Sequence, residues 1–325
     1  MDEKLSKSFT FLQVIIVSLF FSRLTFAQST PWYDEPIHPL PITQDQSPQK
    51  AALGKQLFHE PRLSRNNTIS CAHCHVISNG GIDGLPVPIG IEGQKGVINT
   101  PTVLNSRFNF VQFWDGRAKS LEEQVTGPIH NPREMGSNWE EVIRKLSDDE
   151  QYRNQFNLIY PDGITGKNIS DAIASFEKTL TTPNSRFDKF LRGDIQAITE
   201  QEKQGYELFK NYGCASCHQG RSVGGNMFEK MGIMNDYFKD RGNIAKADYG
   251  RFNITGKEVH RYEFKVPSLR NVALTAPYFH DGSAKTLKQA VYVMAKYQLG
   301  RKLPDADTEK IIAFLKTLTG EIPGL

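Results

Sequence analysis

The chain contains 325 residues, with 39 Lys and Arg against 36 Asp and Glu, and its formal net charge at pH 7 is +3. This near balance of charge, without a basic cluster, argues against nucleic acid as a partner. The length is enough for two domains of ordinary size, and no segment is of low complexity.

The N-terminus has the pattern of a secretory signal peptide. Lys4 and Lys7 precede an apolar run from Phe9 to Phe21, and Thr25-Phe26-Ala27 offers the small residues that signal peptidase needs. The run is about 13 residues long, well short of the roughly 20 that span a bilayer. We therefore expect residues 1–27 to be removed, with no stable membrane anchor and with the bacterial periplasm as the compartment. An uncleaved anchor is the alternative.

One five-residue pattern, CxxCH, occurs twice and uses every cysteine of the chain. Two thiols in this spacing can form thioethers to a haem, and the adjacent histidine then ligates the iron. The two copies are 143 residues apart, whereas the knuckles of a zinc ribbon lie roughly 15–20 residues apart, and a CxxC disulfide closes too small a loop to stabilise much. The sequence predicts two covalently bound haem c groups, held by Cys71, Cys74 and His75 and by Cys214, Cys217 and His218.

The repeat extends well beyond the two motifs. Amphipathic helices with inward-facing Leu and Phe are predicted before each motif, around residues 54–58 and 205–209. Downstream, residues 101–105 match 267–271 and residues 115–121 match 281–287, both at an offset of 166 residues. These matches indicate an internal duplication.

The duplication defines the expected fold class. We predict a mainly α protein of two cytochrome c-like domains, each with one haem c, and irregular Gly/Pro-rich stretches at 79–101 and 219–260. A helix over Asp171–Thr181, ended by Pro183, precedes a boundary near Thr182–Ser185. The expected domains are residues 28–183 and 184–325.

The two halves differ in the residues expected on the side of the haem opposite the CxxCH histidine. At the shared offset, Met294 corresponds to Pro128. A methionine thioether is an axial ligand that suits electron transfer, whereas proline cannot ligate; an apolar filler on a helix is the alternative role for Met294. The first half instead offers Trp114, Gln124 and Glu134, whose side chains can move protons or electrons. We therefore expect one haem to relay electrons and the other to have chemistry beside it.

At this point the sequence resembles the bacterial di-haem cytochrome c peroxidases over nearly all of the expected mature chain. The resemblance is carried by the two CxxCH motifs and by the blocks 53–64, 101–105, 112–118, 134–135, 265–267 and 277–282. It implies a peroxidatic haem on His75 and an electron-accepting haem on His218 and Met294.

The resemblance also implies roles for several other residues. Gln124 and Glu134 would line the peroxide pocket, and Trp114 would lie between the haems. Asn99, Thr275 and Pro277 fall where the family holds an inter-domain Ca²⁺, and hard oxygen ligands suit this ion.

One departure from the family pattern concerns activation. Many members carry a distal histidine that blocks the peroxidatic iron until the other haem is reduced, and Ile91 stands at this position. Isoleucine cannot ligate, so we expect little or no need for reductive activation. His59 and His130 are possible substitute ligands, although packed or surface roles fit them better. His280, opposite Trp114 in the repeat, is expected to order its loop.

The expected reaction is the reduction of hydrogen peroxide to water. Glu134 would carry the proton between the two oxygens and Gln124 would orient peroxide, although a solvated Glu134 paired with Arg133 is the alternative. The electron donor would be a small cytochrome c or a cupredoxin, and a homodimer remains open. Three alternative functions are a di-haem electron carrier, a quinol-linked enzyme and a di-haem enzyme that oxidises tryptophan residues of a partner protein. The last of these has tyrosine where this chain has Met294.

Overall fold

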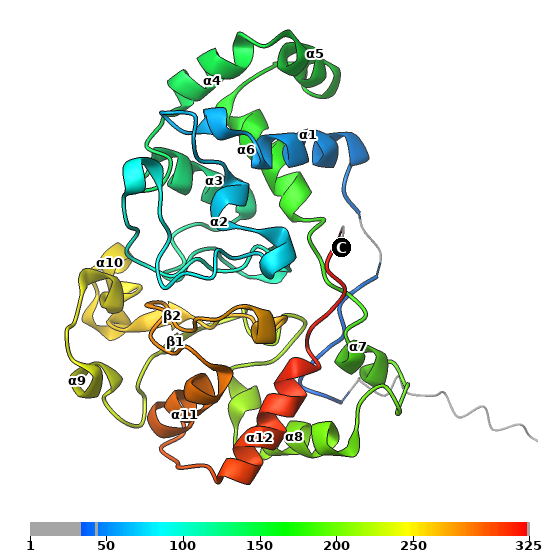
Figure 1. Cartoon of the computed structure of the whole chain (residues 1–325), viewed down its shortest axis with the longest axis vertical. Helices are drawn as coiled ribbons and strands as arrows, with labels where there is room; N and C mark the ends of the chain where they lie inside the picture. Colours follow the sequence, from blue (N-terminus) through cyan, green and yellow to red (C-terminus); the bar gives the residue numbers. More distant parts are fainter. Residues whose placement is uncertain (1–33, 43–44, 324–325) are drawn as a thin grey trace, which may run out of the picture.

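Two helix pairs, one in each half of the molecule, form the framework of the fold. The computed structural model describes residues 34–42 and 45–323, so the predicted signal peptide lies outside the described residues. The first half occupies the top of Figure 1 and the second half the bottom, and together they are mainly helical, as predicted. The helices of the first half are α1 (Pro48–Phe58), α2 (Cys71–Cys74), α3 (Leu121–His130), α4 (Trp139–Ser147), α5 (Glu150–Ile159) and α6 (Gly166–Glu177).

The second half repeats this plan and adds a small ribbon. Its helices are α7 (Arg186–Leu191), α8 (Glu200–Asn211), α9 (Tyr237–Arg241), α10 (Phe252–Thr255), α11 (Leu287–Tyr297) and α12 (Asp305–Lys316). The strands β1 (Phe228–Lys230) and β2 (Glu263–Lys265) pair antiparallel. The ribbon, α9 and α10 lie on the lower left of Figure 1 and belong to the part of the second half that is longer than its counterpart.

Glycines explain why the helix pairs cross so closely. A Cβ on Gly54 of α1 would lie 1.8 Å from the carbonyl oxygen of Ala172 in α6, and a Cβ on Gly205 of α8 would lie 2.0 Å from that of Lys310 in α12. Only a residue without a side chain permits this backbone approach. Leu57 and Phe58, which follow on α1, are fully buried, so the predicted inward-facing Leu and Phe are confirmed there.

The helix α6 differs from its predicted extent. It starts at Gly166, five residues before the predicted start, because the Thr165 side chain caps it by accepting from the Asn168 N–H. It ends at Glu177, four residues before the predicted end. The following residues leave the helix to bond with the loop around Asn105, whose N–H donates to the Leu180 carbonyl (2.8 Å).

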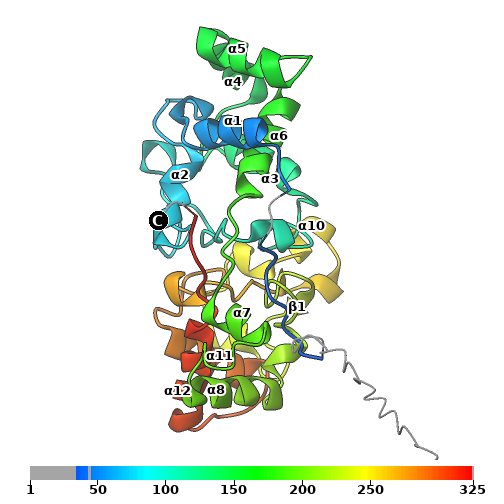
Figure 2. The ribbon, with the colours of Figure 1, turned by 90° about the vertical axis from the view of Figure 1, so that its right-hand side faces the viewer.

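One hydroxyl, that of Thr182, binds equivalent residues of the two halves. Asn105 and Asn271, which are equivalent in the repeat, both donate from Nδ2 to Oγ1 of Thr182, at 2.8 and 2.9 Å. The Thr182 N–H donates back to Oδ1 of Asn105, and the Gly320 N–H to Oδ1 of Asn271. Figure 2 shows the two segments involved, the green one after α6 and the red one after α12, running between the halves.

The N-terminal arm, residues 34–42, packs on the second half. Ile37 and Leu40 are buried, and the backbone of the arm exchanges hydrogen bonds with Gly220, two residues after His218. The predicted domain boundary at 183/184 divides the sequence into two halves. The arm precedes this boundary but packs on residues that follow it, so contacts cross the boundary.

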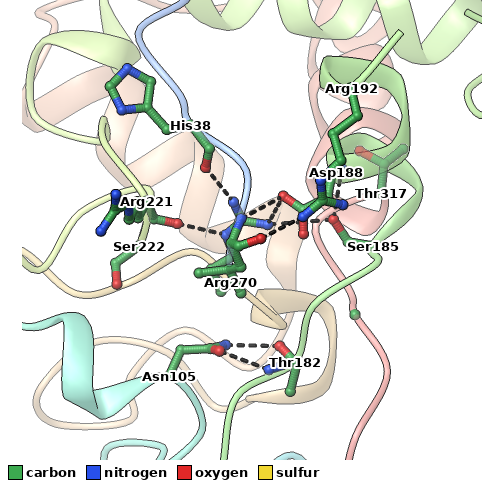
Figure 3. Close-up of polar contacts among 12 residues, drawn as sticks. His38, Asn105, Thr182, Ser185, Asp188, Arg192, Arg221, Ser222, Arg270 and Thr317 are labelled. Atoms are coloured by element: carbon green, nitrogen blue, oxygen red, sulfur yellow. Dashed lines mark hydrogen bonds and ion pairs between the residues drawn. The ribbon is translucent and has the colours of Figure 1, made fainter. Parts of the chain in front are cut away.

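Arg270 connects the N-terminal arm to helix α7 through a buried ion pair and hydrogen bonds. Its guanidinium pairs with Asp188 at 2.7 Å, with both side chains fully buried, and donates to the carbonyl oxygens of Arg221 and His38 at 2.8 Å each (Figure 3). The Leu40 N–H donates to the same carboxylate.

Within the described residues, no helix is sufficiently long and apolar to cross a membrane.

Candidate active site

A cavity of about 60 Å³ lies in the first half, directly beside the first CxxCH motif. Helices α2, α3 and α6 form its walls together with the segments around Pro88 and Glu134. The residues that line it and carry chemistry are Cys71, Cys74, His75, Gln124, Glu134 and Glu177. The structure thus brings together the predicted cofactor-binding residues of this half and two of the three predicted catalytic residues.

Both CxxCH histidines are arranged as neutral ligands. The Nδ1 atoms of His75 and His218 bond to the carbonyl oxygens of Gly81 (3.2 Å) and Val223 (3.4 Å). Burial lowers the pKa of both imidazoles, that of His218 to about 4. A neutral ring with Nδ1–H bound to a carbonyl leaves Nε2 with its lone pair for a metal. These donors, beside half-buried thiols at the CxxC spacing, therefore fit a haem c at each motif.

Pro128 stands in the first half at the repeat position of Met294, the predicted axial ligand. It lines the cavity from the last turns of α3, on the same helix as Gln124. Proline has no N–H and no donor atom in its side chain, so it can neither ligate nor bond to the Gln124 carbonyl one turn earlier. The cavity is therefore lined by the amide of Gln124 and the carboxyls of Glu134 and Glu177, and Pro128 brings no donor atom to the position equivalent to Met294. The buried Met135, which follows Glu134, contributes the thioether side chain of the lining.

Glu134 is half-buried at the cavity wall and is held by a neighbouring side chain. Its Oε1 accepts from Nδ2 of Asn131 at 2.6 Å. Burial raises the pKa of the Glu134 carboxyl above its usual range, while the Asn131 hydrogen bond and the charge of Arg117 act in the opposite direction. No ion pair between Glu134 and Arg133 is found among the described residues, so the pairing with Arg133 that the sequence allowed is absent from the structure. A carboxyl with a raised pKa can exchange protons at neutral pH.

Ile91 lies behind the cavity wall. It is fully buried in the core of the first half, and its N–H donates to the Glu134 carbonyl at 2.9 Å. A Cβ on Gly136 would lie 2.4 Å from Cδ1 of Ile91, so this side chain is tightly enclosed. The neighbouring Gly90 lines the cavity in its place. The loop is thus fastened to the segment that carries Glu134.

Trp114 comes from the first half but lies in an aromatic cluster of the second. Its Nε1–H donates to the Asn99 carbonyl at 2.9 Å, and its ring meets those of Phe264 and His280 edge-on with centroids 6.4 Å away. Met294, on α11, packs against the same cluster. The indole is therefore placed at the junction of the halves, and it packs against the same cluster as the residue expected to ligate the second iron.

Several histidines fall outside the cavity. His59 is exposed and bonds to the Lys55 carbonyl, and His130 is exposed with its ring against Trp139. His280 is buried; its Nε2 bonds to Asp248 at 2.6 Å and its ring stacks on Phe264 at 4.4 Å. These positions fit the packing and loop-ordering roles expected for them.

Among the residues predicted to bind calcium, Asn99 is oriented so that its side-chain oxygen can face a cation. Asn99 is buried, and its Nδ2 donates to the carbonyls of Leu85 and Pro86, so the amide is oriented with Oδ1 on the other side. Its N–H donates to the His280 carbonyl, which brings the segment before Pro101 against the loop after Pro277. The oxygen-rich junction is compatible with a hard cation, and the calcium site stays a prediction.

Sequence reasoning missed Glu177. This residue of α6 is 5% exposed, lines the cavity, and its Oε2 has no partner in residues 34–42 and 45–323. Burial, helped by the charge of Glu122, raises its pKa to about 8. Its signal was present in the sequence, because it lies four residues after Ile173 and therefore on the apolar face of the helix.

The fold and the two motifs define a c-type cytochrome with two haem sites in unlike surroundings. A model of the di-haem cytochrome c peroxidase family matches residues 48–196, and one of the cytochrome c family matches residues 202–319. A cytochrome c551 peroxidase of Nitrosomonas europaea is 47% identical over 96% of this chain and 92% of its own length. The chain belongs to the di-haem cytochrome c peroxidase family.

Two further proteins are similar to the chain. A cytochrome c peroxidase of Escherichia coli is 53% identical over 88% of this chain, which spans only 62% of that protein. The crystal structure of a MauG-like protein associated with microbial copper homeostasis has a TM-score of 0.76 at 30% identity, covering 88% of this chain and 93% of that one. The predicted family and fold class are confirmed.

Proposed function

We propose that this enzyme reduces hydrogen peroxide to water in the periplasm, using electrons from a small cytochrome c or a cupredoxin that enter through the haem on His218. The observation that carries the proposal is the convergence of Gln124 and Glu134 on the cavity beside His75, where Pro128 replaces the methionine of the other half.

Glu134 supplies the proton transfers that the reaction needs. Peroxide must lose a proton to bind ferric iron well, and its outer oxygen must gain one to leave as water. The haem supplies the iron that binds peroxide and passes electrons to it. A carboxyl with a raised pKa, held by Asn131 and not by a cation, can take the first proton and return it. Gln124 orients peroxide through its amide. Two electrons and two further protons complete the conversion to two water molecules.

Trp114 is proposed as the path between the two haems. Its indole reaches from the loop before α3 into the cluster that holds Met294. The hydrogen bond to the Asn99 carbonyl and the edge-on contacts with Phe264 and His280 fix its orientation. Electrons taken one at a time by the haem on His218 and Met294 would cross here, and a calcium ion on Asn99, Thr275 and Pro277 would hold the junction rigid.

The first haem is proposed to be ready for peroxide without prior reduction. Ile91 offers no donor atom, and it is enclosed by Gly136 and bonded to the Glu134 backbone. The oxidised protein should therefore show a high-spin or water-bound haem. Two low-spin haems and a lag before turnover would contradict this part of the proposal.

The test is a steady-state assay with peroxide and reduced cytochrome c on the holoenzyme and on Glu134→Gln. Loss of a positioned acid–base group predicts a fall in kcat/KM of about 10²–10⁴-fold with both haem spectra intact. The acid limb of the wild-type pH profile should lie above the usual carboxyl pKa, because burial raises that of Glu134, and the variant should lose this limb. Glu140→Gln, on the exposed face of α4, is the matched control. Unchanged activity in Glu134→Gln would remove the residue from the mechanism, and no peroxidase activity in the wild type would favour an electron carrier.

A further inference from the structure

Lys265 is a largely buried lysine for which no ion pair is found among the described residues. It ends strand β2, and only 6% of its surface is exposed. Its Nζ makes neither an ion pair nor a hydrogen bond with any described residue, and burial alone lowers its pKa, to about 8. The nearest acid on its strand, Glu263, is already paired with Arg251 at 2.8 Å. Lysine is almost never buried unless it is paired, because an isolated charge is costly to remove from water.

The repeat gives this lysine a defined position. At the 166-residue offset, Lys265 corresponds to Asn99, and Trp114 corresponds to His280. The backbone bonds obey the same correspondence: the Asn99 N–H donates to the His280 carbonyl at 2.7 Å, and the Lys265 N–H donates to the Trp114 carbonyl at 2.8 Å. Each half therefore presents the equivalent residue to the other across the junction, an amide in one case and an ammonium in the other.

Lys265 also belongs to the loop behind the second iron ligand. A Cβ on Gly224 would lie 2.3 Å from the carbonyl oxygen of Pro267 and 3.3 Å from Nδ1 of His218, so Pro267, two residues after Lys265, lies close to the His218 ring. Two residues of extended chain span about 7 Å, roughly the reach of a lysine side chain. An extended Lys265 side chain is therefore long enough to reach the surroundings of the haem that His218 would carry.

An unpartnered acceptor among the described residues near this segment is neutral. Oδ1 of Asn109 is buried without a hydrogen-bond partner among the described residues. It lies 2.2 Å from the position of a Cβ on Gly225, whose N–H donates to the Val266 carbonyl. An amide oxygen can accept a hydrogen bond but cannot neutralise a buried cation.

We propose that Lys265 forms an ion pair with a propionate carboxylate of the haem on His218. A haem c carries two propionates at the edge opposite its thioethers, so it brings the anion that the chain lacks here. The pairing would neutralise both charges and provide, through a side chain, the cation that the equivalent position in the other half is proposed to obtain from calcium. The inference depends on covalent haem attachment but not on peroxidase activity.

The test compares the reduction potentials of the two haems in holoprotein variants by spectroelectrochemistry. In Lys265→Met, the midpoint potential of the haem on His218 should fall, because loss of a nearby positive charge favours the ferric state. Lys265→Arg keeps the charge and should restore most of the potential. Lys230→Met, which removes an exposed lysine from strand β1 of the same ribbon, should change neither potential. Unchanged potentials in Lys265→Met, or a shift confined to the haem on His75, would overturn the pairing.

A measurement on the wild type covers the case in which Lys265→Met fails to attach haem. Infrared difference spectra of protein with ¹³C-labelled haem propionates should show an ionised carboxylate at pH 5, because the ammonium holds its pKa low. A protonated acid at this pH on the His218 haem would refute the ion pair. Since these readouts need no turnover, their failure is distinguishable from an absence of peroxidase activity.

Discussion

Replacing Arg270 with methionine should destabilise the second half strongly. The substitution leaves the Asp188 carboxylate fully buried without its cation, and it removes donors from the carbonyl oxygens of Arg221 and His38 (Figure 3). Breaking a buried ion pair by removing one partner costs about 3–5 kcal/mol. With a urea m-value of about 2 kcal/mol/M, a loss of about 4 kcal/mol lowers the unfolding midpoint by about 2 M.

The assay is urea unfolding of the holoprotein, followed by tertiary fluorescence and by haem absorbance. Arg261→Met is the control, because Arg261 pairs with Glu258, whose side chain is 72% exposed, and such surface pairs contribute at most about 1 kcal/mol. The arm of residues 34–42 should also become sensitive to proteolysis in Arg270→Met, since the carbonyl of His38 loses its donor.

A double variant separates the ion pair from packing. Arg270→Met combined with Asp188→Asn removes both charges, and its cost should be smaller than the sum of the two single variants by about 0.5–3 kcal/mol. A cost for Arg270→Met no larger than that of the Arg261→Met control, or strict additivity in the double variant, would show that the reasoning about the buried pair is wrong.

Two further predictions concern the first cavity and the helix crossing. Ile91→His should raise the low-spin fraction of the oxidised first haem and introduce a lag before turnover, because a buried imidazole lacks partners in the core and is driven toward the iron. Ile89→His, at a position 41% exposed, should cause neither effect. Identical spectra of Ile91→His and the wild type would contradict the argument. Gly205→Ala should lower stability by about 1–3 kcal/mol in chemical unfolding, because the added methyl meets the Lys310 carbonyl, whereas Gln201→Ala on the exposed face of α8 should be nearly neutral. An unchanged unfolding midpoint for Gly205→Ala would mean that the helices can separate without cost.

The parts of the fold that sequence predicted well are those with a repeated local pattern. These parts are the glycine before each haem motif, the CxxCH spacing and the aligned positions of Pro128 and Met294. Each can be compared directly between the two halves of the sequence. The end of α6 could not be predicted in this way, because the bonds that unwind the chain after Glu177 come from Asn105, 72 residues earlier.

The candidate site shows the same limit. Gln124 and Glu134 were found through resemblance, and the structure adds that both line one cavity. Glu177 and Lys265 were overlooked because each looks like an ordinary solvated charge until its burial is known. Burial depends on what packs above a residue, and a single sequence records this only indirectly.

The shared hydroxyl of Thr182 limits what can be done with either half alone. Asn105 and Asn271 depend on the same oxygen, and the chain that supplies it is also crossed by the backbone of Gly320. A fragment cut between the halves would leave one of these buried amides without its acceptor wherever the cut is placed. The end of the first copy, at Thr182, thus completes the second copy, and Ile322 near the end of the second packs against the core of the first. The duplication therefore produces two haem-binding units that we expect to fold only together.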